Sequence, residues 1–162
     1  MKGYAKACSF EKVVTILILD DEFDLVTILK RGLEIQGFRV FSFTDPFLAL
    51  EHFKINAFNY NLVISDLRMP GMSGFEFLTK VKEIKSDIMI FLMTAFEVSD
   101  MQSSVAISSL KINEFIVKPF SIHNLNVIID KYVSLKKIIA EISLHFHLKT
   151  FYNDSTFTIT NF

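Results

Sequence analysis

Apolar runs alternate with amphipathic stretches along this chain of 162 residues. Residues 13–19 and 62–65 are continuous apolar runs bounded by polar or turn residues, which suits strands covered on both faces. Residues 88–93 and 115–117 have the same character, whereas 38–43 alternates between apolar and polar positions. The pattern therefore predicts five strands, with the alternating one at an edge of the sheet.

Helical periodicity fills the intervals between these runs. The stretch 25–35 has apolar residues three to four apart and stops at Gly37, and Asp45-Pro46 opens a second helix to about residue 53. Ser73 can cap a third helix. The apolar stripe expected on the third helix comprises Phe75, Leu78, Val81 and Ile84. Two more helices are expected at 98–110 and from Ser121 onward.

Five strands that alternate with helices predict an α/β fold. We expect a five-stranded parallel sheet, doubly wound, with right-handed crossovers and a C-terminal helical extension. Before the fifth strand the chain reads Ser108 to Glu114, and Asn113 is the residue expected to take a left-handed conformation there.

The charge balance excludes some partners. There are 17 Lys and Arg against 18 Asp and Glu, a net charge of −1, which predicts no direct nucleic-acid binding. No apolar run is long enough for a membrane span, and Cys8 is the only cysteine, so no internal disulfide can form. We expect a cytoplasmic protein without membrane insertion. His52 and His123 are isolated in the sequence and are expected to be solvated.

Chemically active side chains follow four of the five predicted strands. Asp20 and Asp21 follow the first, Asp66 the third, Thr94 the fourth and Lys118 the fifth. Because the carboxyl ends of parallel strands meet at one edge, these groups should share a crevice. Three carboxylates repel one another unless a cation lies among them, and Mg²⁺ is the natural partner. Asp66 could then attack phosphorus as a nucleophile, while Thr94 and Lys118 hold the phosphoryl oxygens.

These residues, with their neighbours, carry a family resemblance. The matching segments are Asp20-Asp21, Asp66 to Gly74 (DLRMPGMSG), Thr94-Ala95 and Lys118-Pro119-Phe120. Over about residues 12–135 the chain resembles the CheY-like receiver domains of two-component response regulators. All four motifs occur in order and at strand ends, so the match is specific.

The resemblance implies a phosphoprotein. Asp66 would accept a phosphoryl group from a sensor histidine kinase or a phosphotransfer protein. Mg²⁺ would be bound by Asp21, Asp66 and the backbone carbonyl of Arg68, with Asp20 acting largely through water. The chain would not be an enzyme, although it would catalyse its own phosphorylation and dephosphorylation. The family also usually has a cis peptide bond before the proline at position 119.

The family's conformational switch maps onto Thr94 and Phe115. Movement of Thr94 toward the phosphoryl group would let Phe115 turn inward, and the surface of the fourth helix, fifth strand and fifth helix would carry the output to a protein target. An ordinary core position remains the alternative for Phe115. Arg68 and Phe96 flank the path of an attacking water, and a bulky apolar Phe96 predicts slow autodephosphorylation.

The predicted organisation is an N-terminal arm (1–11), a receiver domain (12–135) and a helical extension with a tail (136–162). The extension is too short for an output domain. Apolar residues three and four apart continue through it, as in a coiled-coil seam: Leu125, Ile128, Tyr132, Leu135, Ile139, Ile142 and Phe146. Homodimerisation through this helix and packing of its first half on the sheet both remain open.

Three other interpretations were weighed. A haloacid-dehalogenase-like phosphohydrolase needs a second acid two residues after the nucleophile, where this chain has Arg68. A flavodoxin relative needs a phosphate loop where Asp20, Asp21 and Glu22 stand. A receiver-like interaction or dimerisation module that is never phosphorylated should lack an acid, the hydroxyl or the lysine. None is missing here, and this module is the remaining alternative function.

Overall fold

A computed structural model describes residues 13–95 and 110–153 of the chain, with side chains as far as residue 145. The chain forms two compact units, Met1–Ile122 and His123–Phe162. The first contains the sheet and the second most of a long helix, and each is treated by itself. The predicted N-terminal arm, most of the helix predicted at 98–110 and the end of the tail lie outside the described residues.

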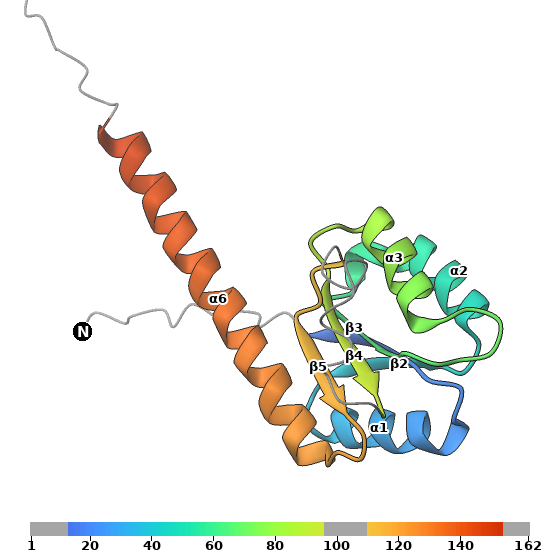
Figure 1. The fold of residues 1–162 in the computed structure, drawn as a ribbon. Coiled ribbons are helices and arrows are strands. Elements are labelled where there is room, and N and C mark those ends of the chain that lie inside the picture. Colours follow the sequence, from blue (N-terminus) through green and yellow to red (C-terminus); the bar gives the residue numbers. More distant parts are fainter. Residues whose placement is uncertain (1–12, 96–109, 154–162) are drawn as a thin grey trace, which may run out of the picture. The chain divides into compact units, whose positions relative to one another are not determined.

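The sheet of the first unit has five parallel strands in the order β2-β1-β3-β4-β5 (Figure 1). They are β1 (Thr15–Leu19), β2 (Arg39–Phe43), β3 (Leu62–Asp66), β4 (Met89–Thr94) and β5 (Glu114–Val117). Every residue of β1, β3 and β4 is buried, as expected for the continuous apolar runs. The alternating run forms β2 at an edge, where it pairs only with β1. The predicted α/β sheet is confirmed.

Helices cover both faces of this sheet: α1 (Phe23–Ile35) lies on one face, and α2 (Pro46–Asn56) and α3 (Gly74–Ile84) lie on the other (Figure 1). A short 3₁₀ helix, η1 (Ala57–Asn59), follows α2. The side chain of Asp45 accepts hydrogen bonds from two amides at the start of α2. Ser73 and Glu76 form a reciprocal capping box on α3, which confirms the predicted cap.

The buried stripe of α3 differs from the prediction. Its buried positions are Gly74, Phe77, Leu78 and Val81. Phe75 is only half-buried, and Ile84 is 39% exposed. The predicted stripe advanced in steps of three, which rotate steadily around a helix of 3.6 residues per turn. The observed stripe combines steps of three and four and therefore stays on one face.

The approach to β5 also differs from the prediction. Lys111, not Asn113, has the left-handed backbone, with φ of 50°. Asn113 instead bonds to β4: its side chain accepts from the Ile90 amide at 2.8 Å, and its own amide donates to the Ile90 carbonyl at 2.9 Å. Asn113 therefore fixes the start of β5 beside β4.

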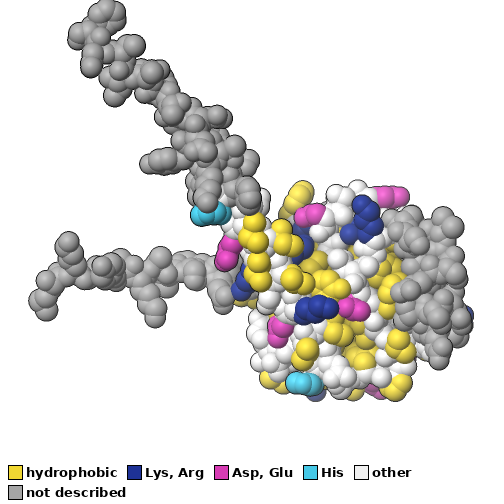
Figure 2. Space-filling view, turned by 60° about the vertical axis from the view of Figure 1, so that its left-hand side comes forward, with side chains coloured by type: hydrophobic (Ala, Val, Ile, Leu, Met, Phe, Trp, Pro, Cys, Tyr) yellow, Lys and Arg dark blue, Asp and Glu magenta, His cyan; other side chains and the backbone are white. Residues whose placement is uncertain are grey.

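The second unit consists mainly of α6 (Ile122–Asn153), a helix of 32 residues. Several large apolar side chains in its middle are exposed: Leu135, Ile138, Ile139, Ile142 and Leu144. Hydrophobic side chains are visible at the molecular surface in Figure 2, between acidic and basic ones. No helix among the described residues is long and apolar enough to cross a membrane.

Candidate functional site

The sheet register brings the predicted acids together. Leu19 of β1 is paired with Ser65 of β3, so Asp20 and Asp66 are the next residues of two adjacent strands. Asp66 is in turn paired with Met93, one residue before Thr94. Asp20 is fully buried and Asp66 is 7% exposed, so both carboxylates are held at the floor of this edge rather than in solvent.

Local turns fix the orientation of Asp66. Its Oδ2 accepts a hydrogen bond of 2.7 Å from the backbone amide of Arg68. Gly74 at the start of α3 lies so close that a Cβ there would be 1.8 Å from the carbonyl oxygen of Asp66. The hydroxyl of Ser65 donates to the same carbonyl at 2.9 Å. The loop of residues 67–73 therefore returns directly against the backbone of Asp66.

Lys118 places its ammonium group between two of the acids. Its Nζ lies 2.7 Å from Oδ2 of Asp20 and 2.6 Å from Oδ1 of Asp66. Burial is the largest single influence and lowers the pKa of Lys118, but the hydrogen bonds and charges of Asp20 and Asp66 together outweigh it and raise this pKa above its ordinary value. Lys118 is thus a charged cation at neutral pH. Its peptide bond to Pro119 is cis, as the family resemblance implied.

A pocket of about 270 Å³ opens above this ion-pair cluster. It is lined by Asp21, Glu22, Asp66, Leu67, Arg68, Thr94, Ala95 and Lys118. Asp20 is not part of the lining but contacts two residues that are: its carboxylate pairs with Lys118 and accepts a hydrogen bond of 2.9 Å from the Glu22 amide. Thr94 is 1% exposed, and its carbonyl accepts from the Lys118 amide at 2.7 Å. The pocket brings together three carboxylates, a hydroxyl-bearing residue and a cation.

The predicted Mg²⁺ ligands were tested against this geometry. Among residues 13–95 and 110–145, no three acidic, histidine or cysteine side chains lie close enough to hold a metal by themselves. Mg²⁺ does not require three, because it usually keeps several waters and binds one or two carboxylates. Asp21, Asp66 and Arg68 line one pocket, and carboxylate and carbonyl oxygens are the hard ligands that Mg²⁺ prefers. The donor set therefore fits the ion.

The remaining predicted residues lie in different situations. Phe115 is on β5, half-buried, and packs against the core cluster between the sheet and helices α2 and α3. Phe96 lies outside the described residues.

The sequence analysis gave no role to Glu22, Ser65 and Gly74. Glu22 lines the pocket with its carboxylate 3.8 Å from Lys118, and a third acid directly after β1 was its only signal in the sequence. The contacts of Ser65 and Gly74 with the backbone of Asp66 could not be predicted from the spacing of residues in the sequence.

Comparisons with known proteins agree with this arrangement. The model of the response regulator receiver domain family matches residues 16–130. The chain is 31% identical to sporulation initiation phosphotransferase F of Bacillus subtilis over 75% of this chain and 94% of that protein. It is 38% identical to the transcriptional regulatory protein YvrH of Bacillus subtilis over 66% of this chain, but spans only 44% of that protein.

Solved structures show the same fold. A response regulator receiver domain protein from Clostridium thermocellum matches with a TM-score of 0.70 and 26% identity, over 78% of this chain and 99% of that one. Response regulator TrrA from Thermotoga maritima, solved with Mg²⁺ and BeF, matches with a TM-score of 0.62 and 33% identity, over 74% and 98% of the two chains. The match over residues 16–130, the parallel sheet and these relatives together show that the chain belongs to the response regulator receiver domain family of two-component systems.

Proposed function

We propose that Asp66 accepts a phosphoryl group from a phosphohistidine of a sensor histidine kinase or phosphotransfer protein. A carboxylate oxygen of Asp66 would form the new bond to phosphorus. The bond from phosphorus to the imidazole nitrogen would break, and that nitrogen would keep the electron pair and be protonated. The observation that supports this most directly is the placement of Asp66 beside the ammonium of Lys118, in a pocket large enough for a phosphoryl group.

Both oxygens of Asp66 are hydrogen-bonded before any transfer, one to Lys118 and one to the Arg68 amide. Each oxygen keeps a second lone pair, so attack on phosphorus is possible from this arrangement, but the oxygen that forms the new bond becomes a weaker acceptor and its hydrogen bonding changes. We assign that change to Lys118, whose Nζ would move from Asp66 to a phosphoryl oxygen while keeping its bond to Asp20. The hydroxyl of Thr94, which lines the same pocket, would donate to a second phosphoryl oxygen.

When bound, Mg²⁺ would neutralise phosphoryl charge as a Lewis acid. Asp21, Asp66 and the carbonyl of Arg68 are the residues that would hold it. Asp21 is exposed and can turn toward an incoming ion, whereas Asp20 is buried and paired with Lys118. This difference supports a direct role for Asp21 and a role through water for Asp20.

Output would follow from Thr94 and Phe115. Movement of Thr94 toward the phosphoryl group would vacate space for Phe115, whose ring cannot form the hydroxyl contacts of a tyrosine and would be held inward by packing alone. Arg68 and Phe96 would set the lifetime of the acyl phosphate, with slow autodephosphorylation because Phe96 excludes water. A lifetime no longer than that of a Phe96→Glu variant would contradict this assignment.

We infer that the target is a protein and that the receiver works in the cytoplasm without direct nucleic-acid contact or membrane insertion. The net charge of −1 and the similarity across 94% of sporulation initiation phosphotransferase F support this. The proposed organisation keeps an arm at 1–11, a receiver at 12–135 and an extension at 136–162.

The exposed apolar side chains of α6, from Leu135 to Leu144, support homodimerisation through the extension. Light scattering on the phosphorylated and unphosphorylated chain would measure this. A monomer in both states at high micromolar concentration would rule it out.

Incubation with acetyl phosphate and Mg²⁺, followed by intact-mass measurement, tests the phosphoacceptor assignment. We expect a mass gain of one phosphoryl group on the wild-type chain, none on Asp66→Asn, and an undiminished gain on Asp24→Asn, a matched change at an exposed position of α1. Circular dichroism would establish that both variants are folded. No gain on the folded wild-type chain would favour the alternative function, an interaction or dimerisation module that is never phosphorylated.

A further inference from the structure

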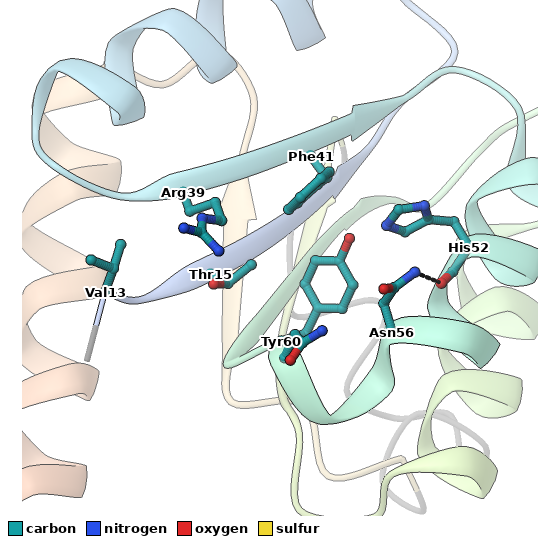
Figure 3. Close-up of a pocket in the computed structure, with 8 residues that line it drawn as sticks. Val13, Thr15, Arg39, Phe41, His52, Asn56 and Tyr60 are labelled. Atoms are coloured by element: carbon teal, nitrogen blue, oxygen red, sulfur yellow. Dashed lines mark hydrogen bonds between the residues drawn. The ribbon is translucent and has the colours of Figure 1, made fainter.

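A second pocket, of about 380 Å³, lies at the opposite end of the strands from Asp66. Its lining comes from the first residues of β1 and β2 and from α2 and the segment after it: Val13, Thr15, Arg39, Phe41, His52, Asn56, Asn59 and Tyr60 (Figure 3). All of these residues belong to the first unit. The volume falls within the range of pockets that bind small organic molecules.

Two polar atoms in this pocket are buried without a partner. Tyr60 is 1% exposed, and its hydroxyl has no hydrogen-bond partner among residues 13–95 and 110–145. Nε2 of His52 is buried and equally unpaired within the same residues. Figure 3 shows the Tyr60 hydroxyl pointing toward Phe41 and His52. Buried polar groups in folded proteins are almost always hydrogen-bonded, so these two atoms are open to a ligand or an ordered water in the cavity. Burial also raises the pKa of the Tyr60 phenol, which keeps it a hydrogen-bond donor.

The walls of the pocket are aromatic. The ring centroid of Phe41 lies 5.3 Å from that of His52 and 5.7 Å from that of Tyr60. The fully buried ring of Phe53 stacks on Tyr60 with a centroid distance of 5.6 Å. His52 was expected to be solvated, and that expectation is wrong because this aromatic cluster half-buries it. A flat apolar ligand could pack against the pocket-facing edges of these rings.

The charge of the residues that line the pocket favours an anionic ligand. Arg39 is the only permanently charged residue in the lining, and its guanidinium forms no ion pair among the described residues. No acidic side chain lines the pocket. In Figure 3 the guanidinium of Arg39 points toward Thr15. Its planar fork could bind a carboxylate with two parallel hydrogen bonds.

The backbone around Tyr60 is held in place without a ligand. The carbonyl of Tyr60 accepts from Nζ of Lys85 at 2.8 Å, and the next residue, Asn61, accepts from the Thr15 amide at 2.9 Å. Asn56 donates to the carbonyl of His52 at 3.0 Å. The pocket is therefore preformed, which lowers the ordering cost of binding.

We propose that this pocket binds a small aromatic carboxylate, with the carboxylate on Arg39 and the Tyr60 hydroxyl and the ring beside Phe41 and His52. The site is separate from the phosphoacceptor pocket, since the two share no lining residue. Its occupation does not depend on whether Asp66 is phosphorylated.

The test uses 2-naphthoate as the probe and neutral 2-naphthamide as its matched control, titrated into the full ¹⁵N-labelled chain at millimolar concentration. We expect saturable amide shifts around Thr15, Arg39 and Tyr60 with the acid, and binding of the amide at least tenfold weaker. Equal affinities for the two probes, no shifts with either, or shifts confined to the Asp66 pocket would each overturn the proposal.

Variants separate the contacts. Arg39→Gln should weaken naphthoate binding about tenfold or more, whereas Arg31→Gln on α1 should leave it unchanged. Tyr60→Phe removes only the unpaired hydroxyl, so it should keep or raise the melting temperature while weakening binding roughly twofold to tenfold. Unchanged affinity in both Arg39→Gln and Tyr60→Phe would show that the shifts do not come from this site.

Discussion

Replacing Gly74 with alanine tests how closely α3 approaches the end of β3, where Asp66 lies. The added Cβ would lie 1.8 Å from the carbonyl oxygen of Asp66, and the neighbouring hydroxyl of Ser65 would be 3.0 Å away. The nearest atom belongs to backbone, so no change of side-chain rotamer can relieve the overlap. Either the start of α3 or the end of β3 must move.

The displacement follows from the contact distance. Cβ atoms are essentially never found closer than 3.0 Å to another atom, so the two backbones must separate by at least 1.2 Å, which is 3.0 minus 1.8. Overpacking of this kind costs about 1 to 3 kcal/mol. Alanine would recover up to about 1 kcal/mol through its better helix propensity. We therefore expect Gly74→Ala to lower the free energy of unfolding, although helix propensity alone would raise it.

Urea unfolding followed by circular dichroism measures this difference. Gly37→Ala is the matched control, because Gly37 has open space around it but a φ of 92°, which costs alanine roughly 1 to 2 kcal/mol. Both variants should lose stability, but only Gly74→Ala should also slow phosphorylation by acetyl phosphate. A Gly74→Ala variant as stable as the wild type would refute the steric reasoning.

Three other changes have defined outcomes. Ser73→Ala removes the capping box of α3 and should lower the free energy of unfolding by about 1 kcal/mol in urea titrations, and an unchanged midpoint would show that the cap contributes nothing. Asn113→Ala leaves the buried Ile90 amide without its acceptor, which should cost about 1 to 3 kcal/mol, whereas Asn113→Asp should retain most of the stability. The folded pKa of Lys118 is raised above 10.5, so its stabilising contribution should be complete below that pH and be lost as the pH rises through the folded value. The difference in stability between wild type and Lys118→Met, measured from pH 7 to 11, should thus stay constant to about pH 10; a decline already between pH 7 and 9 would contradict the ion pairs.

Much of the fold could be predicted from the sequence pattern. A strand buried on both faces, such as β3, has a continuous apolar run, and an edge strand such as β2 alternates between apolar and polar residues. The carboxyl ends of parallel strands share one edge, so Asp66, Thr94 and Lys118 could be grouped before any coordinates were known. Details that depend on side-chain contacts could not. The position of Lys118 between two acids and the left-handed backbone of Lys111 are set by packing, not by periodicity.

The aromatic pocket around Tyr60 was beyond sequence reasoning for a related reason. His52 lies on α2 and Tyr60 directly after η1, and the ring centroids of the two residues are 5.9 Å apart. The spacing of residues in the sequence does not predict this contact.

The ion pair between Lys118 and Asp20 also bears on how the chain folds. Its partners are 98 residues apart, and in the sheet order β3 and β4 lie between the strands that carry them. Contacts between residues far apart in the sequence form slowly, because closing the long loop between them costs conformational entropy before the contact is made. A chain in which β1 and β3 have paired but β5 has not would hold its acids side by side without their internal cation. The arrangement proposed to accept a phosphoryl group would therefore be complete only after the final strand has joined the sheet.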